Sequence, residues 1–366
     1  MSTTAPGTPS WLRERNDRTA LAALFEHGPL TRNRLGELTG MSKPTAAQMV
    51  ARLEQAGLIG PVGEVSGGRG PNAVSYGVRV DRARGVAVDV REHVIVATVV
   101  DALDGDHPVV EVEFAADRTP EGDVRSAIAA ASMAADVDPA TIGSVLVGVQ
   151  ASISSDGEQL SFSEDLHGWP EFGARRRISE SLGLWVGLEN DVNLAAVAER
   201  AVGAGNGADS FALLWIGEGL GVAVDLGGTV HRGAAGGAGE IGYLPVPRTA
   251  DIDVPDADLT DLIGRGAYGR LGAETALEGF AARVALVVEP VLAVLDPELV
   301  VLGGPIGIAG GTRLASLVAE RIASTTRWHP EVRTTAIAGA PVLAGARRML
   351  VDRIREHLAA GISSIP

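Results

Sequence analysis

Residues 31–59 read TRNRLGELTGMSKPTAAQMVARLEQAGLI, and this stretch decides how the start of the chain folds. Thr31 is a natural N-cap for a short helix, which Gly40 then ends. Ser42 caps a longer helix, and Pro44 fits its first turn because the N–H at that position would have no helical partner. The stretch therefore predicts a short helix, a turn that contains glycine, and a longer helix.

The sequence on either side completes this unit. Apolar residues at helical spacing predict a helix over 16–27. Residues 58–59 begin a strand, 64–71 form a turn-rich tip, and 74–78 alternate as a returning strand. This order is that of a winged helix-turn-helix, so we expect a DNA-binding domain over 1–80. A small helical bundle with a hairpin and no role in DNA binding is the alternative.

The longer helix of the quoted stretch would present side chains that can read DNA. We expect its early turns to expose Lys43, Thr45 and Gln48, together with Ala46. Glutamine can read adenine through two hydrogen bonds, and lysine can read guanine. Arg52 comes later and is placed to meet phosphate, while a further arginine lies at the tip of the hairpin. The predicted DNA-binding set comprises Lys43, Pro44, Thr45, Gln48, Arg52 and Arg69.

Charge is distributed unevenly along the chain. The net charge is −15, but residues 1–80 hold nine Lys or Arg and six Asp or Glu, which gives that segment +3. The remaining residues therefore carry −18. A basic head on an acidic body is expected when one end meets phosphate and the other must stay away from it.

Composition excludes several classes of protein. The 366 residues suffice for two or three domains, and 46 % are hydrophobic, as in an ordinary globular protein. Without cysteine, the chain forms no disulfide and no thiolate metal site. It has no apolar run of about 18 residues, and its start lacks the apolar region of a secretory signal. We expect a cytoplasmic protein that needs no cofactor, metal or membrane.

A different pattern begins near residue 84. A strand, an acidic or Gly-rich turn and a second strand are predicted over 85–101, and the same plan recurs over 211–225. A helix over 127–135 and a strand over 145–149 lie between them. Two α/β halves of similar design would face each other across a cleft, where ligands bind at the ends of the strands.

Several motifs of this body occur together and in order. They are LHGWP at 166–170, ENDVN at 189–193, RGA at 232–234, GGAGEIGY at 236–243, LDPE at 295–298 and VLGGP at 301–305. On these motifs, the body resembles the ROK family (repressors, open reading frames and kinases) of the actin-like sugar kinase superfamily. The start of the chain, with GRGP at 68–71, resembles the DNA-binding half of the family's repressors.

The resemblance implies a fold class and an organisation. The fold would be α/β, with the winged helix-turn-helix over 1–80 and a two-lobed actin-like, ribonuclease H-like sugar-kinase fold over 81–366. The lobes would span approximately 84–198 and 199–345, and a C-terminal helix would span 346–360.

Two altered loops argue against phosphoryl transfer. The family's first phosphate loop is D-x-G-G-T, but residues 89–93 read DVREH, without the glycines that close backbone approach to phosphate requires. The second, G-T-G-x-G, reads GEGLG at 217–221, where Glu218 would repel a phosphate. A literal DLGGT at 225–229 lies where the family has a hairpin turn, and we interpret it as that turn. We therefore expect no enzyme activity.

The resemblance implies that the sugar-binding residues are better preserved than the phosphate loops. The family's general base aligns with Asp191, Asn190 is similar to a contact with a sugar hydroxyl, and Glu240 matches another sugar-binding acid. Carboxylates and an amide suit the vicinal hydroxyls of a sugar, because together they both accept and donate. Turn capping is the alternative role for the acids. The predicted effector-binding set comprises Asp165, Asn190, Asp191, Glu240 and Tyr243.

The resemblance also identifies departures. Tyr243 stands where most of the family has a zinc-binding histidine, and no Cys-rich loop follows it, so we expect that the zinc is lost. Thr260 occupies the position of a second sugar-binding glutamate. The ligand would then be an unusual sugar, a phosphosugar or nothing, and the many carboxylates make a phosphosugar the weakest of these.

These observations predict a homodimeric or tetrameric repressor. Its winged heads would bind a pseudo-palindromic double-stranded DNA operator, and a sugar effector would shift the heads through its differential affinity for two arrangements. One alternative is a regulator that binds no ligand and whose body only oligomerises. Another is an active ATP-dependent sugar kinase.

Overall fold

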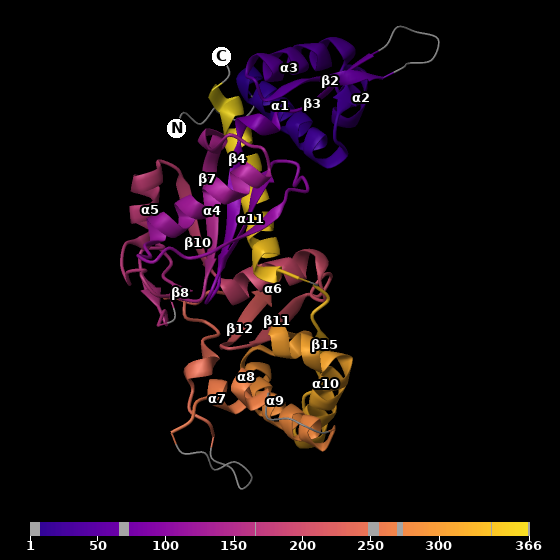
Figure 1. Ribbon diagram of the computed structural model, residues 1–366. Coiled ribbons are helices and arrows are strands. Elements are labelled where there is room, and N and C mark those ends of the chain that lie inside the picture. The colour runs from indigo at the N-terminus through magenta and orange to yellow at the C-terminus, as the bar shows by residue number, and fades with distance from the viewer. Residues whose placement is uncertain are drawn as a thin grey trace.

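The structure is a computed structural model, and it describes residues 8–65, 73–164, 166–247, 256–268, 274–337 and 339–364. Figure 1 shows a small N-terminal head, a first lobe beneath it and a second lobe at the far end, with the last long helix running back toward the head. Within the described ranges, no helix is long and apolar enough to cross a bilayer.

The head folds as the sequence predicts. Its helices are α1 (Pro9–His27), α2 (Arg32–Thr39) and α3 (Lys43–Gln55). Its strands are β1 (Leu30–Thr31), β2 (Ile59–Val65) and β3 (Ala73–Val78), in the antiparallel order β1-β3-β2. Buried leucines and a methionine hold the helices against this sheet, among them Leu21, Leu24, Leu35, Met49 and Leu53.

Side-chain caps set the starts of these helices. Thr31 accepts a hydrogen bond from the backbone N–H of Arg34 at 3.3 Å, and Ser42 accepts one from Thr45 at 3.4 Å. Both caps are the predicted ones, and each satisfies a donor that a helix start leaves unpaired. The first helix begins earlier than the expected residue 16, because Thr8 caps it and Pro9 occupies its first turn.

The first lobe is built on a five-stranded sheet of order β10-β7-β4-β5-β6. Its strands are β4 (Arg84–Val90), β5 (Ile95–Asp101), β6 (Val109–Val112), β7 (Ile142–Val149) and β10 (Trp185–Asn190). Strands β4, β7 and β10 run parallel, whereas β5 and β6 are antiparallel to their neighbours. The carboxyl ends of the three parallel strands therefore meet at one edge of the sheet.

Alternation along β4 places helices on both faces of that sheet. Val86 and Val88 pack in one core with residues of α4 (Pro120–Ala134) and α5 (Ala174–Leu182). Ala87, which points the other way, packs in the core that contains α11 (Pro341–Ala360).

The second lobe repeats the plan of the first. Its sheet has the order β13-β12-β11-β14-β15, in which β11 pairs antiparallel with β12 and parallel with β14. Its strands are β11 (Ser210–Ile216), β12 (Leu220–Leu226), β13 (Thr229–Val230), β14 (Leu299–Gly303) and β15 (Glu331–Thr334). Helices α9 (Glu274–Leu295) and α10 (Gly304–Thr325) pack together in its core. This order confirms the predicted internal duplication.

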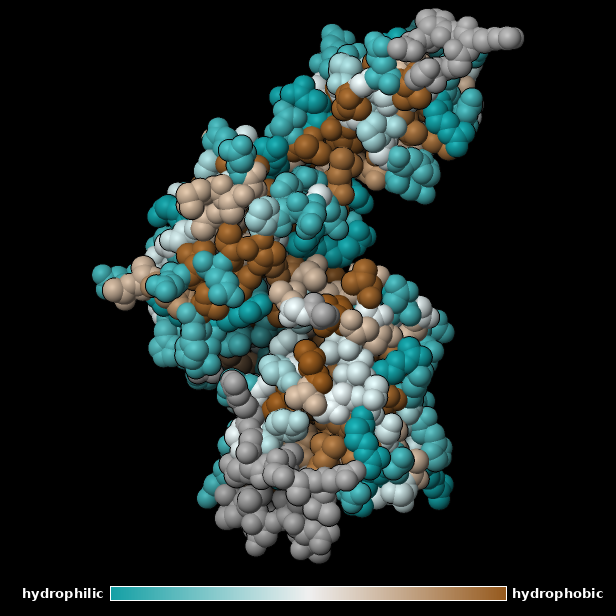
Figure 2. All heavy atoms as spheres, turned by 45° about the vertical axis from the view of Figure 1, so that its right-hand side comes forward, coloured by the Kyte–Doolittle hydropathy of each residue, from teal (hydrophilic) through white to brown (hydrophobic). Residues whose placement is uncertain are grey.

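Helix α11 returns from the second lobe to the first and then reaches the head. It packs so closely on α6 (Asp191–Val202) that a Cβ on Gly345 would lie 1.9 Å from the carbonyl oxygen of Leu194. Beyond its end, Ile362 shares one hydrophobic core with Leu21 and Leu24 of the head. Figure 2 shows the head projecting from the rest of the molecule, with apolar residues where the two join.

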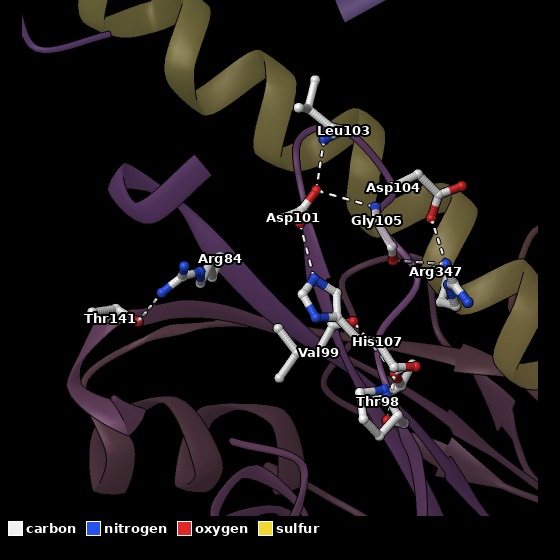
Figure 3. A network of polar contacts seen from close by, with 11 residues as sticks. Arg84, Thr98, Val99, Asp101, Leu103, Asp104, Gly105, His107, Thr141 and Arg347 are labelled. Atoms are coloured by element: carbon white, nitrogen blue, oxygen red, sulfur yellow. Dashed lines mark hydrogen bonds and ion pairs between the residues drawn. The ribbon is translucent and has the colours of Figure 1, made fainter. Parts of the chain in front are cut away.

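A network on the β5–β6 turn fixes α11 against the first lobe (Figure 3). Arg347 donates to a carboxylate oxygen of Asp104 at 3.0 Å, and Arg355 donates to the carbonyl of Ala102 at 2.8 Å. The turn itself is held by Asp101, whose carboxylate lies 2.9 Å from His107 Nε2. Although burial raises the pKa of Asp101, the bonds from His107 and two backbone N–H groups bring it below its ordinary value.

Candidate functional site

The exposed face of α3 carries most of the predicted DNA-reading residues. Lys43, Pro44 and Gln48 are exposed on its first turns. Thr45 is half-buried, and its hydroxyl lies 2.9 Å from that of Ser42, so it also helps to fix the start of the helix. Ala46 is buried, contrary to the prediction, because it faces the core formed with the other helices.

Arg52 has a different partner from the phosphate that the sequence suggested. Its guanidinium donates two hydrogen bonds to the buried carboxylate of Asp17 on α1, and the Nε bond measures 3.0 Å. A buried carboxylate needs such a partner, because leaving it unpaired would be costly. We therefore assign Arg52 to holding α1 against α3. The wing residue Arg69 lies outside the described residues.

Two of the predicted effector residues start α6, at the carboxyl end of β10. The side-chain oxygen of Asn190 caps the helix by accepting from the N–H of Asn193 at 3.0 Å. Its amide nitrogen donates to the carbonyl of Ala151 at 3.2 Å. One N–H and one lone pair of the amide remain for a ligand. Asp191 follows as the first helical residue and is half-buried.

Asp191 sits among other acids. Burial, followed by the charges of Asp89 and Glu240, raises the pKa of Asp191 to about 7. Burial, followed by the charge of Glu164, raises the pKa of Glu240. We call these four residues the carboxylate cluster. Like charges this close cannot all ionise without cost, so near neutral pH Asp191 can either donate or accept a hydrogen bond.

A glycine-rich segment carries Glu240 to this position. Gly236 and Gly239 have φ angles of 84° and 92°. A Cβ on Gly236 would lie 1.9 Å from the carbonyl oxygen of Ile153, and one on Gly239 would lie 1.7 Å from that of Val222. Only glycine fits these positions, because the segment passes against backbone from both lobes.

Two aromatic rings flank the carboxylate cluster. The rings of Phe162 and Tyr243 lie 4.8 Å apart, and both side chains are exposed. The hydroxyl of Tyr243 donates to Glu164 at 3.1 Å. Aromatic faces beside hydrogen-bonding acids suit a sugar, whose C–H face is apolar and whose edge carries hydroxyls. Phe162 was not singled out from the sequence, since no local pattern marks it.

The structure also shows an ion pair between two motif residues to which the sequence analysis assigned no role. Glu189 is buried, and its carboxylate accepts from Arg232 at 2.6 Å and from Asn193 at 3.1 Å. Because Glu189 is the last residue but one of β10 and Arg232 follows β13, this pair ties the two lobes together beside the carboxylate cluster.

The phosphate-loop positions have their own local partners. Arg91 bonds Asp89 at 2.7 Å, and His93 lies 3.4 Å from Glu92 on an exposed turn. Gly217 donates to the carbonyl of Gly219 at 3.0 Å, which makes 217–219 a tight turn between β11 and β12. At 225–229, Gly227 and Gly228 form the turn between β12 and β13 with φ angles of 62° and 82°. The prediction of a hairpin turn there is confirmed.

Two other predicted positions complete the site. Asp165 lies outside the described residues. The hydroxyl of Thr260 donates to the carbonyl of Gly242 at 3.2 Å, so it supports the segment beside Tyr243. Among the described residues, no three His, Asp or Glu side chains converge in a way that could hold a metal ion.

Comparisons with known proteins match both parts of the chain. Residues 13–59 match the winged helix-turn-helix DNA-binding family, and residues 85–256 match the ROK family. The Xylose repressor of Bacillus subtilis (strain 168) is 23 % identical over 280 residues, which cover 73 % of this chain and 68 % of that protein. The predicted combination of a winged helix-turn-helix and a ROK family domain is confirmed.

Solved structures show the same fold. A ROK family transcriptional regulator, described as a homolog of the E. coli MLC protein, superposes with a TM-score of 0.64 at 16 % identity, covering 96 % of this chain and 98 % of that one. A ROK family glucokinase from Streptomyces griseus, in complex with glucose and AMPPNP, superposes with a TM-score of 0.56 at 22 % identity. That match covers 73 % of this chain and 98 % of the glucokinase. The likeness confirms the two-lobed fold behind a winged head.

Proposed function

We propose that this chain, a ROK family domain behind a winged helix-turn-helix, is a sequence-specific DNA-binding repressor that responds to a sugar. The observation that carries the proposal is the covalent union of two surfaces. One is the capped helix α3, with Lys43 and Gln48 exposed for base contacts. The other is the carboxylate cluster with its aromatic pair. The likeness to the Xylose repressor supports this combination.

The head would act in pairs. We propose a homodimer or a homotetramer that places two copies of α3 on half-sites one helical turn, or a multiple of one, apart. The sugar would bind better to one arrangement of the heads than to the other and so shift their equilibrium. Helix α11 joins the two surfaces, because it packs on α6, which begins at Asp191, and its end reaches the core of the head.

Selection of bound DNA from a random pool tests the DNA-reading surface. Lys43→Ala and Gln48→Ala should change the selected sequence, whereas Gln55→Ala, exposed at the far end of the same helix, should not. The log–log dependence of affinity on salt should have a slope of about −0.9 for each phosphate contacted. A dissociation constant independent of salt would contradict a DNA role.

The assignment of Arg52 to a structural role has its own test. Arg52→Gln should leave the salt slope unchanged and lower the free energy of unfolding by about 2–3 kcal/mol, because Asp17 would lose its charged partner. Urea denaturation and the salt titration separate the two roles. A slope smaller in magnitude by about 0.9 with unchanged stability would return Arg52 to the DNA-binding set.

Thermal-shift screening with a sugar panel tests the carboxylate cluster. A stabilising sugar should also release DNA from the wild type, and Asp191→Ala should abolish that release. Failure of every sugar to stabilise the protein would favour a regulator that binds no ligand.

We further propose that the chain does not phosphorylate sugars. The first loop carries Arg91 and Glu92 in place of the glycines whose backbone N–H groups would cradle phosphates, and Glu218 is exposed in the second loop. Incubation with ATP, Mg²⁺ and the same sugar panel should yield no sugar phosphate. Measurable product would favour an active kinase that also binds DNA.

A further inference from the structure

A second candidate site lies at the junction of the head and the first lobe. A cavity of about 200 Å³ opens there at the amino ends of β4, β7 and β10. Each of these strands spans six to eight residues, so the cavity is about 20 Å from the carboxylate cluster at their other ends. We call it the junction cavity. Its remaining walls come from α11 and from η1 (Val80–Arg82), the turn that leads out of the head.

The junction cavity is lined by positive charge. Its ionisable lining residues are Arg82, Arg84, Arg353 and His357, and none of its lining residues is a carboxylate. No ion pair joins these arginines to an acid within the part of the chain that the structure describes. The nearby Asp81 instead pairs with Arg79 at 2.7 Å. That pairing, more than the charge of Arg84, holds the pKa of Asp81 at about 2.

One donor of the lining residue Arg84 is left without a partner among the described residues. The Nε atom of Arg84 is buried and makes no hydrogen bond, although its terminal nitrogen meets the hydroxyl of Thr141 at 3.5 Å (Figure 3). Buried donors are normally satisfied, so Arg84 retains hydrogen-bonding capacity that the described residues do not use. The site is also shaped for a ligand. The guanidinium of Arg353 is held over the ring of Trp185, 4.9 Å from its centroid, and nothing lies within 4 Å of where a Cβ on Gly143 would stand.

We propose that the junction cavity binds a small phosphorylated metabolite, with its phosphate group on Arg84 and Arg353. Guanidinium groups match the oxygens of a phosphate and stay charged at every physiological pH. In a chain of net charge −15, arginines gathered without acids do not serve general solubility. The carboxylate cluster would repel such a ligand, so the two sites select different chemistry.

Occupancy of this cavity would act on the head. The guanidinium carbon of Arg82 lies 3.6 Å from where a Cβ on Gly57, just after α3, would stand. A Cβ on Gly361, just after α11, would lie 3.6 Å from Leu58 of the head. A ligand held by Arg84 and Arg353 therefore clamps the two segments that support the head. Binding in the cavity is independent of the proposed function, whereas an effect on DNA affinity rests on it.

Calorimetric titration of the full chain tests the site without DNA. The probes are glucose 6-phosphate, inorganic phosphate and unphosphorylated glucose, at constant ionic strength in chloride. Arg84→Gln and Arg353→Gln should each weaken glucose 6-phosphate binding about tenfold or more, and Gly143→Leu should block it by filling the open space. Arg348→Gln is the matched control on α11, because Arg348 is exposed and pairs with Asp352 at 3.2 Å outside the cavity.

The outcomes distinguish a phosphorylated metabolite, inorganic phosphate and DNA as the source of the phosphate group. Competition by inorganic phosphate at the same arginines supports the site and identifies phosphate itself as the recognised group. Wild-type affinity in both arginine variants, or loss of glucose 6-phosphate binding in Asn190→Ala, would overturn the proposal. Failure of both phosphates to bind, together with weaker DNA binding by Arg353→Gln, would also overturn it in favour of a DNA phosphate contact. Arg353→Lys, which keeps the charge, should retain intermediate affinity and guards against misfolding of the glutamine variants.

Discussion

The two ends of the first-lobe sheet carry opposite charge. At the carboxyl ends of β4 and β10 stand Asp89 and Asp191, joined by Glu240 from the second lobe. At the amino ends of the same strands stand Arg84 and, from α11, Arg353. The same three parallel strands thus separate an acidic site from a basic one.

One lobe can therefore bind two chemically different ligands, one at each end of its sheet. At the acidic end, hydrogen-bond acceptors, one of them with a raised pKa, suit the hydroxyls of a neutral sugar. At the basic end, guanidinium groups without acidic partners suit an anion. Each end also contacts a different part of the chain, since the acidic end meets the second lobe and the basic end meets the head.

Glycine substitutions at the two ends of the sheet should differ most in their effect on the free energy of unfolding. Gly239→Ala should lower the free energy of unfolding by about 3 kcal/mol or more, because its φ is 92° and the new Cβ would overlap Val222. Gly143→Ala at the other end should change it by less than about 0.5 kcal/mol, because the new methyl group enters open space. Urea denaturation of both variants measures the contrast. Equal stabilities would mean that the segment before Glu240 yields to accommodate a side chain.

The pH dependence of stability should come from the acidic end. The pKa of Asp191 is raised to about 7, so the folded protein keeps a proton that the unfolded chain loses near pH 4. The stabilising contribution of Asp191 is therefore greatest below pH 4 and is lost as the pH rises from about 4 to about 7. Asp191→Asn should remove that loss and raise stability at pH 8 by about 1–2 kcal/mol.

Denaturant titrations of Asp191→Asn and the wild type at pH 5, 6.5 and 8 check this expectation. Glu164→Gln is a control, because Glu164 is exposed and influences Asp191 only through Glu240. A wild type whose stability rises steadily over this interval, with a parallel curve for Asp191→Asn, would show that Asp191 is ionised throughout.

Substitutions of Tyr243 should separate the contributions of ring stacking and of hydrogen bonding to sugar affinity at the acidic end. Tyr243→Phe removes the hydroxyl that donates to Glu164 but keeps the ring beside Phe162, so sugar binding should weaken about threefold to tenfold. Tyr243→Ala removes both and should weaken it further. The measurement uses the stabilising sugar found by thermal shift. Unchanged affinity in Tyr243→Ala would place the sugar elsewhere.

The smallest expected effect is that of salt on ligand affinity, which should differ between the two ends of the sheet. Raising chloride from about 50 to about 200 mM should weaken glucose 6-phosphate binding at the junction cavity about threefold, because exposed charges are screened over about 10 Å. A neutral sugar at the carboxylate cluster should show no such change. Equal salt dependence at both ends would contradict the assignment of opposite charge preferences.

Much of the fold follows from local sequence. Ser42 and Thr31 cap the helices that they were predicted to cap, because a cap acts within three residues. The two predicted strand–turn–strand units form equivalent strand pairs in the two sheets, because a continuous apolar run bounded by turn residues is a local signal. Several starts were placed too late, among them those of α1 at Pro9, α4 at Pro120 and β7 at Ile142.

The residues of the candidate sites could be predicted from the sequence less completely than the fold. The resemblance placed Asn190, Asp191 and Glu240 in one site, and the structure brings Asp191 and Glu240 within electrostatic reach of each other. It did not identify Phe162 or the pair of Glu189 and Arg232, whose roles depend on contacts between lobes. The position of Arg52 late in the predicted recognition helix suggested a phosphate contact, although its partner in the structure is 35 residues away.

Local sequence specifies the helix caps of the head, the strand–turn–strand plan of both halves and the loss of glycines from the first phosphate loop. Which charges meet depends on the tertiary fold. Arg84 and Arg353 are 269 positions apart in the chain, and they line one cavity only because α11 returns to the sheet that β4 begins. Propensity and capping act over a few residues, whereas electrostatic partners are set by distance in space, which the return of α11 and the closing of the lobes create.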